Sequence, residues 1–158
     1  MDNRSDTPAP KGRNLRIGRH SQPGRSYLIT AATCKRQPFF AVFPVAVVAA
    51  RCFDDPELLA GNCMLAWVLM PDHAHWLVRL GENGDLARLV ARLKSASARA
   101  ANRVHGRNGV IWQHGYHDHA LRHDEDMRSA ARYLIANPVR AGVAEEVGDY
   151  PFWNAVWL

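Results

Sequence analysis

The chain has 158 residues, a hydrophobic fraction of 47% and a formal net charge of +5, values typical of one globular domain rather than a disordered chain. Its polar start and its lack of an apolar run of roughly 18 residues argue against a signal peptide and a membrane span. Three widely spaced cysteines predict free thiols in a reducing compartment. We therefore expect a cytoplasmic protein without a membrane partner, and the positive charge favours a polyanionic one.

A basic, polar segment precedes the first strand-like stretch. Residues 1–25 are predicted to be a flexible arm in which Arg13, Arg16 and Arg19 could lie along DNA phosphates. A solubilising tail would have the same composition. Residues 26–158 are predicted to form a single domain.

Three strands and one helix are predicted in the first half of this domain. β-Branched and aromatic residues over 26–33 predict a strand, and the alanine- and valine-rich stretch 42–53 predicts a helix. The apolar run 63–70, a proline-containing turn and the alternating stretch 73–80 predict a hairpin.

Alternation in the second hairpin strand separates two faces. One face is predicted to carry His73, His75, Leu77 and Arg79, and the apolar core face to carry Ala74, Trp76, Val78 and Leu80.

A long helix is predicted to start after Asp85, which is a suitable N-cap. Its predicted core stripe comprises Leu86, Leu89, Val90, Leu93, Ala100 and Val104. A second stripe, predicted either to bind DNA phosphates or simply to be solvated, comprises Arg88, Arg92, Arg99 and Arg103.

The last predicted elements are a strand over 110–121 and a helix that begins near Asp124 and stops near Asn137, before Pro138. The core face of this helix is predicted to comprise Met127, Ala130, Ala131 and Leu134. The aromatic tail is expected to pack back on the domain. The element order is that of an α+β fold with a central antiparallel sheet covered by helices.

His73 and His75 project from one strand face, so both imidazoles could reach one metal ion. Two half-exposed sheet histidines with no metal would give the same pattern. The sequence shows no zinc-finger spacing and lacks the longer histidine and aspartate signature of a metallohydrolase.

Tyr133 and Asn137 are four residues apart and are predicted to share a helix face beside the core stripe. A tyrosine hydroxyl can attack a phosphodiester and store the bond energy as a phosphotyrosine ester. A metal would help by withdrawing charge from the phosphate, and the Asn137 carbonyl could be its third ligand. A packing tyrosine and a helix-terminal asparagine are the structural alternatives.

Other tyrosines and histidines are weaker candidates. Tyr116 lacks a polar companion four residues on, and we assign it to structure or to DNA contact. His117 and His119 form a second pair of alternating histidines. We interpret this pair as a polar strand face that lines a DNA cleft rather than as a second metal site, and we assign DNA contact to His119.

Three stretches resemble a known family. MPDHAHWLV resembles the histidine motif of single-tyrosine HUH nucleases, and RYLIANPVRAGV resembles the tyrosine helix of REP-associated tyrosine transposases. VIWQHGYHDHALRHDED is similar to the block that joins the two motifs in that family.

This resemblance implies a ferredoxin-like fold and metal-assisted cleavage of single-stranded DNA near palindromic REP hairpins. It implies that His73 and His75 bind Mg²⁺ or Mn²⁺ and that Tyr133 is the nucleophile. Asn137 aligns with a glutamine ligand of mobile relatives and is one methylene shorter. Asp72 replaces the commoner asparagine of the histidine motif and lies in the turn, where we expect it to have no role in the chemistry. A monomer is favoured over a dimer, because the sequence shows no long exposed apolar seam, and a dimer stays possible.

Two other functions remain open at this stage. The chain could bind hairpin DNA or RNA as a regulator without cutting it, or it could be a metal-dependent phosphodiesterase that uses water.

Overall fold

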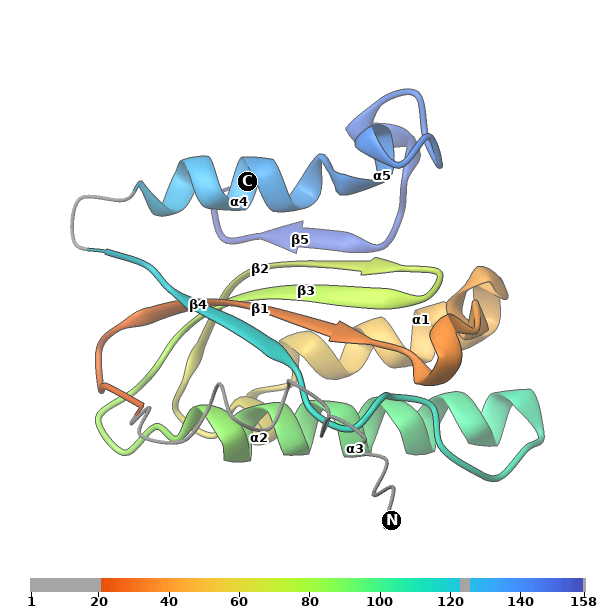
Figure 1. The fold of residues 1–158 in the computed structure, drawn as a ribbon, viewed down its shortest axis with the longest axis horizontal. Coiled ribbons are helices and arrows are strands. Elements are labelled where there is room, and N and C mark those ends of the chain that lie inside the picture. The colour runs from red at the N-terminus through yellow and green to blue at the C-terminus, as the bar shows by residue number, and fades with distance from the viewer. Residues whose placement is uncertain (1–20, 123–125, 158) are drawn as a thin grey trace, which may run out of the picture.

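The computed structural model describes residues 21–122 and 126–157, which form one five-stranded sheet with helices on both faces (Figure 1). The strands are β1 (Ser26–Ala32), β2 (Cys63–Met70), β3 (His73–Arg79), β4 (His117–Ala120) and β5 (Trp153–Ala155). The helices are α1 (Phe43–Arg51), α2 (Pro56–Leu59), α3 (Leu86–His105), α4 (Met127–Ile135) and α5 (Asn137–Arg140). Short 3-10 turns occur at Cys34–Arg36, Phe39–Ala41, Cys52–Asp54 and Val147–Asp149.

The sheet has the strand order β4-β1-β3-β2-β5, and every pair of neighbours is antiparallel. The first four strands, with α1 and α3 as crossover helices, follow the β-α-β-β-α-β order of a ferredoxin-like fold. The predicted α+β class is therefore confirmed.

One face of the sheet is closed by α1 and α3, which pack against each other (Figure 1). Aromatic side chains fill the interface: the Phe53 ring lies 5.2 Å from Trp76 and 5.4 Å from Trp67, measured between centroids. Trp76 also meets Trp112 at 6.0 Å. We call this side the covered face.

The opposite face is only partly covered. Helix α4 packs mainly against β2 and also contacts β3 and β5 (Figure 1). The β4 side is left accessible, since His117 and His119 are exposed and Thr30 of β1 is half-buried. We call this side the open face.

Helix α3 follows the prediction at its start and departs from it near its end. Asp85 caps it by accepting a hydrogen bond from the Arg88 backbone N–H. Ser97 and Ala101 are buried in its second half, whereas Val104 is 45% exposed. Assigning Ala100 and Val104 to the core was wrong, because the apolar stripe drifts around the helix and a buried serine continues it. Ser97 bonds the Leu93 carbonyl and accepts from Trp112 Nε1, which makes burial of its hydroxyl tolerable.

The strand predicted over 110–121 is much shorter. Only His117–Ala120 pair with β1, and Trp112 makes a single bridge to Thr33. Ile111 and Trp112 are buried without belonging to a strand, so their apolar character reflects packing against α3 rather than sheet pairing.

The final helix is divided. The Asp126 side chain caps α4 through the Arg128 N–H, whereas the predicted cap Asp124 lies outside the described residues. Helix α4 ends at Ile135, and Asn137 begins the separate α5 with Pro138 in its first turn, where a missing N–H costs little. The predicted core residues hold: Ala131 and Leu134 are buried, and Met127 and Ala130 pack beside them.

The aromatic tail packs back as expected, and it also adds the edge strand β5 to β2, which the sequence did not predict. No helix among the described residues combines the length and apolarity needed to cross a bilayer.

Candidate active site

Strand register brings the predicted histidines together with residues of neighbouring strands. Side chains of directly paired residues project to the same side of a sheet. One row across the open face therefore comprises His117, Thr30, His75 and Val68. The next row comprises His119, Leu28, Leu77 and Ala66.

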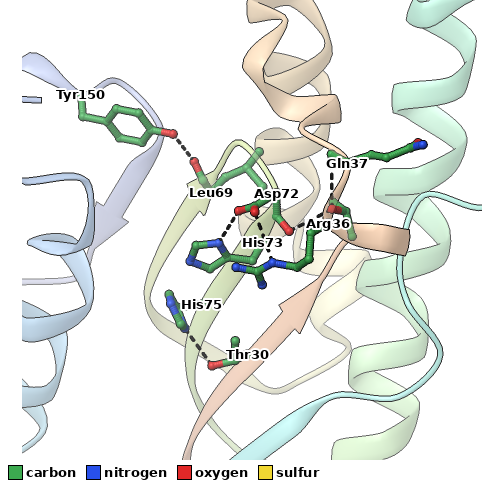
Figure 2. Close-up of polar contacts among 9 residues, drawn as sticks. Thr30, Arg36, Gln37, Leu69, Asp72, His73, His75 and Tyr150 are labelled. Carbon is green, nitrogen blue, oxygen red and sulfur yellow. Dashed lines mark hydrogen bonds and ion pairs between the residues drawn. The ribbon is translucent and has the colours of Figure 1, made fainter. Parts of the chain in front are cut away.

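Each imidazole is held through its Nδ1 atom (Figure 2). His73 Nδ1 lies 2.7 Å from Asp72 Oδ1, and since a carboxylate accepts, this nitrogen carries the proton. His75 Nδ1 lies 2.8 Å from Thr30 Oγ1, a hydroxyl that can likewise accept. In these tautomers both Nε2 lone pairs are available to a metal, and the ring centroids are 4.9 Å apart.

A turn after β1 supports Asp72 (Figure 2). The Arg36 guanidinium lies 3.2 Å from Asp72 Oδ2, and Thr33 Oγ1 donates to the Asp72 carbonyl and to that of Gln37. Lys35 and Arg36 both adopt positive φ, near 54° and 55°, which is strained for residues with side chains. Asp72, which the sequence placed in a turn without a role, therefore links His73 to this ordered loop.

The environment of His75 keeps its ring neutral. Burial has the largest effect, and the electrostatic effects of the neighbouring His73, Arg140 and Arg36 act in the same direction, so that the pKa falls to about 4. Only a neutral imidazole can bind a metal ion, so His75 is in the ligand-competent form at neutral pH.

Tyr133 projects from α4 and is 64% exposed. The Arg140 guanidinium lies over its ring, 3.7 Å from the centroid, and donates to the Tyr133 carbonyl at 2.6 Å. That carbonyl belongs to the last turn of α4, where helical partners run out. Arg140 also acts electrostatically on His75, so this one residue connects the tyrosine to the histidine pair.

Asn137 does not share a continuous helix with Tyr133. The break at Ala136 puts the two residues on consecutive helices, so the single helix that the sequence predicts for them is divided. Asn137 is half-buried, and its side chain makes no hydrogen bond to any described residue. Among residues 21–122 and 126–157, no three His, Cys, Asp or Glu side chains form a metal site, so within this part of the chain a third protein ligand would be of another type.

The predicted DNA-binding residues fall in different places. His119 lies on the open face, one row from His75. Tyr116 lines a cavity beside α3, in the other layer.

The predicted arginine stripe belongs to α3, which packs with α1 in the layer that covers the opposite side of the sheet. Arg92 donates to the Leu58 carbonyl at 2.8 Å, a contact within the fold, whereas Arg88, Arg99 and Arg103 are exposed. Arg13, Arg16 and Arg19 lie outside the described residues. A role in DNA binding stays a prediction for all of these arginines.

Sequence reasoning missed Thr30, Arg36 and Arg140. Strand pairing brings Thr30 to His75 and could not be derived from one strand alone. Arg140 stands within the quoted tyrosine-helix motif, which was the available signal.

Comparisons with known proteins bear on the family and the fold of the chain. The model of the family described as "Transposase IS200 like" matches residues 29–137. A Haemophilus influenzae protein described as a REP-associated tyrosine transposase is 35% identical over 98 residues, 56% of this chain and 56% of its own length. The Escherichia coli K12 REP-associated tyrosine transposase is 32% identical over 87 residues, 55% of this chain and 50% of that one. The match thus spans about half the length of these relatives.

Two solved structures share the fold. A REP-associated tyrosine transposase bound to a REP hairpin superposes with a TM-score of 0.66 at 23% identity, covering 85% of this chain and 79% of that one. A Deinococcus radiodurans protein described as a transposase has a TM-score of 0.52 at 24% identity, covering 76% and 95%. Because the family model matches more than half of the chain, the chain belongs to the IS200-like transposase family.

Proposed function

We propose that this chain is a metal-dependent endonuclease and strand transferase that acts on single-stranded DNA at REP-type palindromic hairpins. Its relatives are described as REP-associated tyrosine transposases, and one related structure holds a REP hairpin. The observation that carries the proposal is the pair of imidazoles, each held through Nδ1, on the sheet face that carries the tyrosine helix.

The residues present fit a divalent metal such as Mg²⁺ or Mn²⁺. His73 and His75 would supply Nε2 ligands, because Asp72 and Thr30 engage their Nδ1 atoms and the lowered pKa of His75 keeps it neutral. Asn137 would supply an amide oxygen as the third protein ligand, and its side chain is not committed to another described residue. The bound metal would withdraw charge from the scissile phosphate.

Tyr133 would be the nucleophile. Its Oη would form a bond to the phosphorus while the bond to the 3′ oxygen breaks, so that the products are a 5′-phosphotyrosine and a free 3′-hydroxyl. The phenolic proton is lost to solvent and the 3′ oxygen gains one, and because the ester conserves the bond energy, rejoining needs no ATP.

Arg140 would orient this nucleophile. Its stacking on the Tyr133 ring and its bond to the Tyr133 carbonyl restrict the side chain, which is otherwise exposed. Its positive charge would also favour a bound phosphate next to the histidines.

Detection of a covalent adduct tests the proposal. The protein is incubated with a labelled REP-type hairpin carrying single-stranded flanks, with Mn²⁺, Mg²⁺ or EDTA, and resolved under denaturing conditions. We expect a metal-dependent protein–DNA adduct in the wild type and in Tyr116→Phe, and none in Tyr133→Phe.

The other outcomes separate the alternatives. An adduct that persists in Tyr133→Phe refutes the assignment of Tyr133 as the nucleophile. Cleavage without any adduct indicates a phosphodiesterase that uses water, and hairpin binding without cleavage under any metal indicates a non-catalytic regulator.

A further inference from the structure

A group of positively charged side chains lies on the open face, away from His73 and His75. A cavity of about 400 Å³ is lined by Arg25, Arg79 and Arg122, together with Ser26 and Met127 and other residues of the surrounding turns. Arg25 immediately precedes β1, Arg79 ends β3, and Arg122 lies in the segment after β4. Residues far apart in sequence thus place three positive charges around one cavity.

This cavity and the histidine pair lie on the same strand face. Arg79 follows His75 by four residues along β3, so both project to one side, roughly 13 Å apart. The pairing of β1 with β3 also places Arg79 and His75 on one face, because their partners Ser26 and Thr30 are likewise four residues apart along β1. Between them runs the second row of the open face, in which Leu28 is half-buried and His119 is exposed.

Two of the arginines make only neutral contacts with described residues. Arg25 donates to Gln22 Oε1 at 2.7 Å and to the Leu121 carbonyl at 3.4 Å. Arg79 contacts Met127 Sδ at 3.2 Å. These contacts hold the guanidinium groups in place without cancelling their charge, which leaves them suited to an anion.

The start of α4 also borders the cavity, but it is not the source of this charge. Asp126 accepts hydrogen bonds from the Arg128 N–H and the Ser129 hydroxyl, so a carboxylate already occupies this helix end. The arginine side chains are what an anion would meet.

We propose that the cavity of Arg25, Arg79 and Arg122 binds a backbone phosphate of the single-stranded flank of the DNA. This inference rests on the proposed function for the identity of the strand. With one phosphate held here, a short extended stretch of DNA would lie along the open half of the sheet and reach His73 and His75. Half-exposed side chains between the two sites, such as Leu28, could contact the bases, as flat sheet faces do in single-strand-binding proteins.

Binding measurements on a cleavage-deficient background test the inference independently of the chemistry. Arg79→Gln and Arg25→Gln are each combined with Tyr133→Phe, and the Kd is measured in EDTA with a fluorescent hairpin that has a single-stranded flank. Each variant should weaken binding about tenfold, as expected for a lost charge-assisted contact. The slope of log Kd against log salt concentration should fall by about 0.7 for each lost phosphate contact to a single strand.

Two controls locate the effect. Arg51→Gln removes an equal charge from the exposed end of α1 and should leave the Kd within about twofold of the parent. A blunt hairpin without a flank should bind the parent, Arg79→Gln and Arg25→Gln equally. Thermal unfolding of every variant checks that the fold is kept.

A neutral methylphosphonate, placed at each flank linkage in turn, identifies the phosphate. One linkage should weaken binding by the parent and cause no further loss in Arg79→Gln. The inference is overturned if Arg51→Gln weakens binding as much as Arg79→Gln, if the blunt hairpin shows the same loss, or if no linkage is coupled to Arg79. Failure of the parent to bind any hairpin would overturn the proposed function as well, whereas binding insensitive to both arginine variants contradicts this inference alone.

Discussion

The two faces of the sheet differ in what covers them and in what they can do. The covered face packs Trp76, Phe53 and Trp67 beneath α1 and α3. The open face, behind the same strands, carries His75, Thr30 and exposed His119 and is covered mainly on its β2 side by α4. The alternation of β3 allows one strand to serve both purposes, so stability and chemistry depend on residues that are adjacent in sequence.

The strongest test of this division compares Trp76→Ala with His119→Ala. Trp76 is fully buried, and its truncation should lower the free energy of unfolding by about 3–5 kcal/mol, measured by denaturant titration. His119 is exposed, so its truncation should lower the free energy of unfolding far less than that of Trp76.

Hairpin affinity should show the reverse order. His119→Ala is expected to weaken binding, whereas Trp76→Ala, measured where it is still folded, should not. Comparable stability losses in the two variants would contradict the division between the faces.

Metal affinity provides a test within the open face. Asp72 holds His73 Nδ1, so Asp72→Ala should reduce affinity for Mn²⁺ by about 10–100-fold, measured by calorimetry, with a small change in unfolding free energy. Asp118→Ala is the matched control: it removes a carboxylate from β4 at a position that pairs with Ile29, on the covered side of the alternation. Equal losses in the two variants would show that general charge, rather than the contact to His73, sets the affinity.

The smallest expected effect concerns Tyr150, whose hydroxyl donates to the Leu69 carbonyl at 2.5 Å beside the tail that packs on β2. Burial raises its pKa from 10.0 to about 12. Between pH 10 and pH 12 the unfolded chain loses the phenolic proton more readily than the folded one. The stability that the protonated Tyr150 contributes to the fold is therefore complete below pH 10 and is lost as the pH rises towards 12.

Urea denaturation between pH 9 and pH 11.5 should therefore show a steeper loss of stability in the wild type than in Tyr150→Phe, whose other ionisable groups are the same. Parallel curves would mean that the phenol is not protected in the folded state.

The sequence predicted correctly those elements that are determined by residues close together in the chain. The hairpin 63–80 and the start of α3 were predicted because alternation and capping act over neighbouring residues. The break between α4 and α5 and the edge strand β5 were not, because tertiary packing decides whether a proline-containing turn continues a helix and where a tail pairs.

For the candidate site, too, the sequence predicted single residues but not the contacts between distant elements. His73, His75 and Tyr133 were identified as candidates from spacing and motif resemblance. The contacts of Thr30 with His75 and of Arg140 with Tyr133 join different elements, and so does the cavity of Arg25, Arg79 and Arg122. A single sequence shows none of these proximities, because they depend on strand order.

The brevity of the outer strands has a consequence for assembly. Helix-flanked sheets often grow by accepting a further strand at an open border, but here β4 offers four residues and β5 only three. Such short borders present few unpaired amide and carbonyl groups in a row, which disfavours strand addition and fibre-like stacking. Self-association of this sheet would therefore depend on side-chain surfaces rather than on backbone pairing.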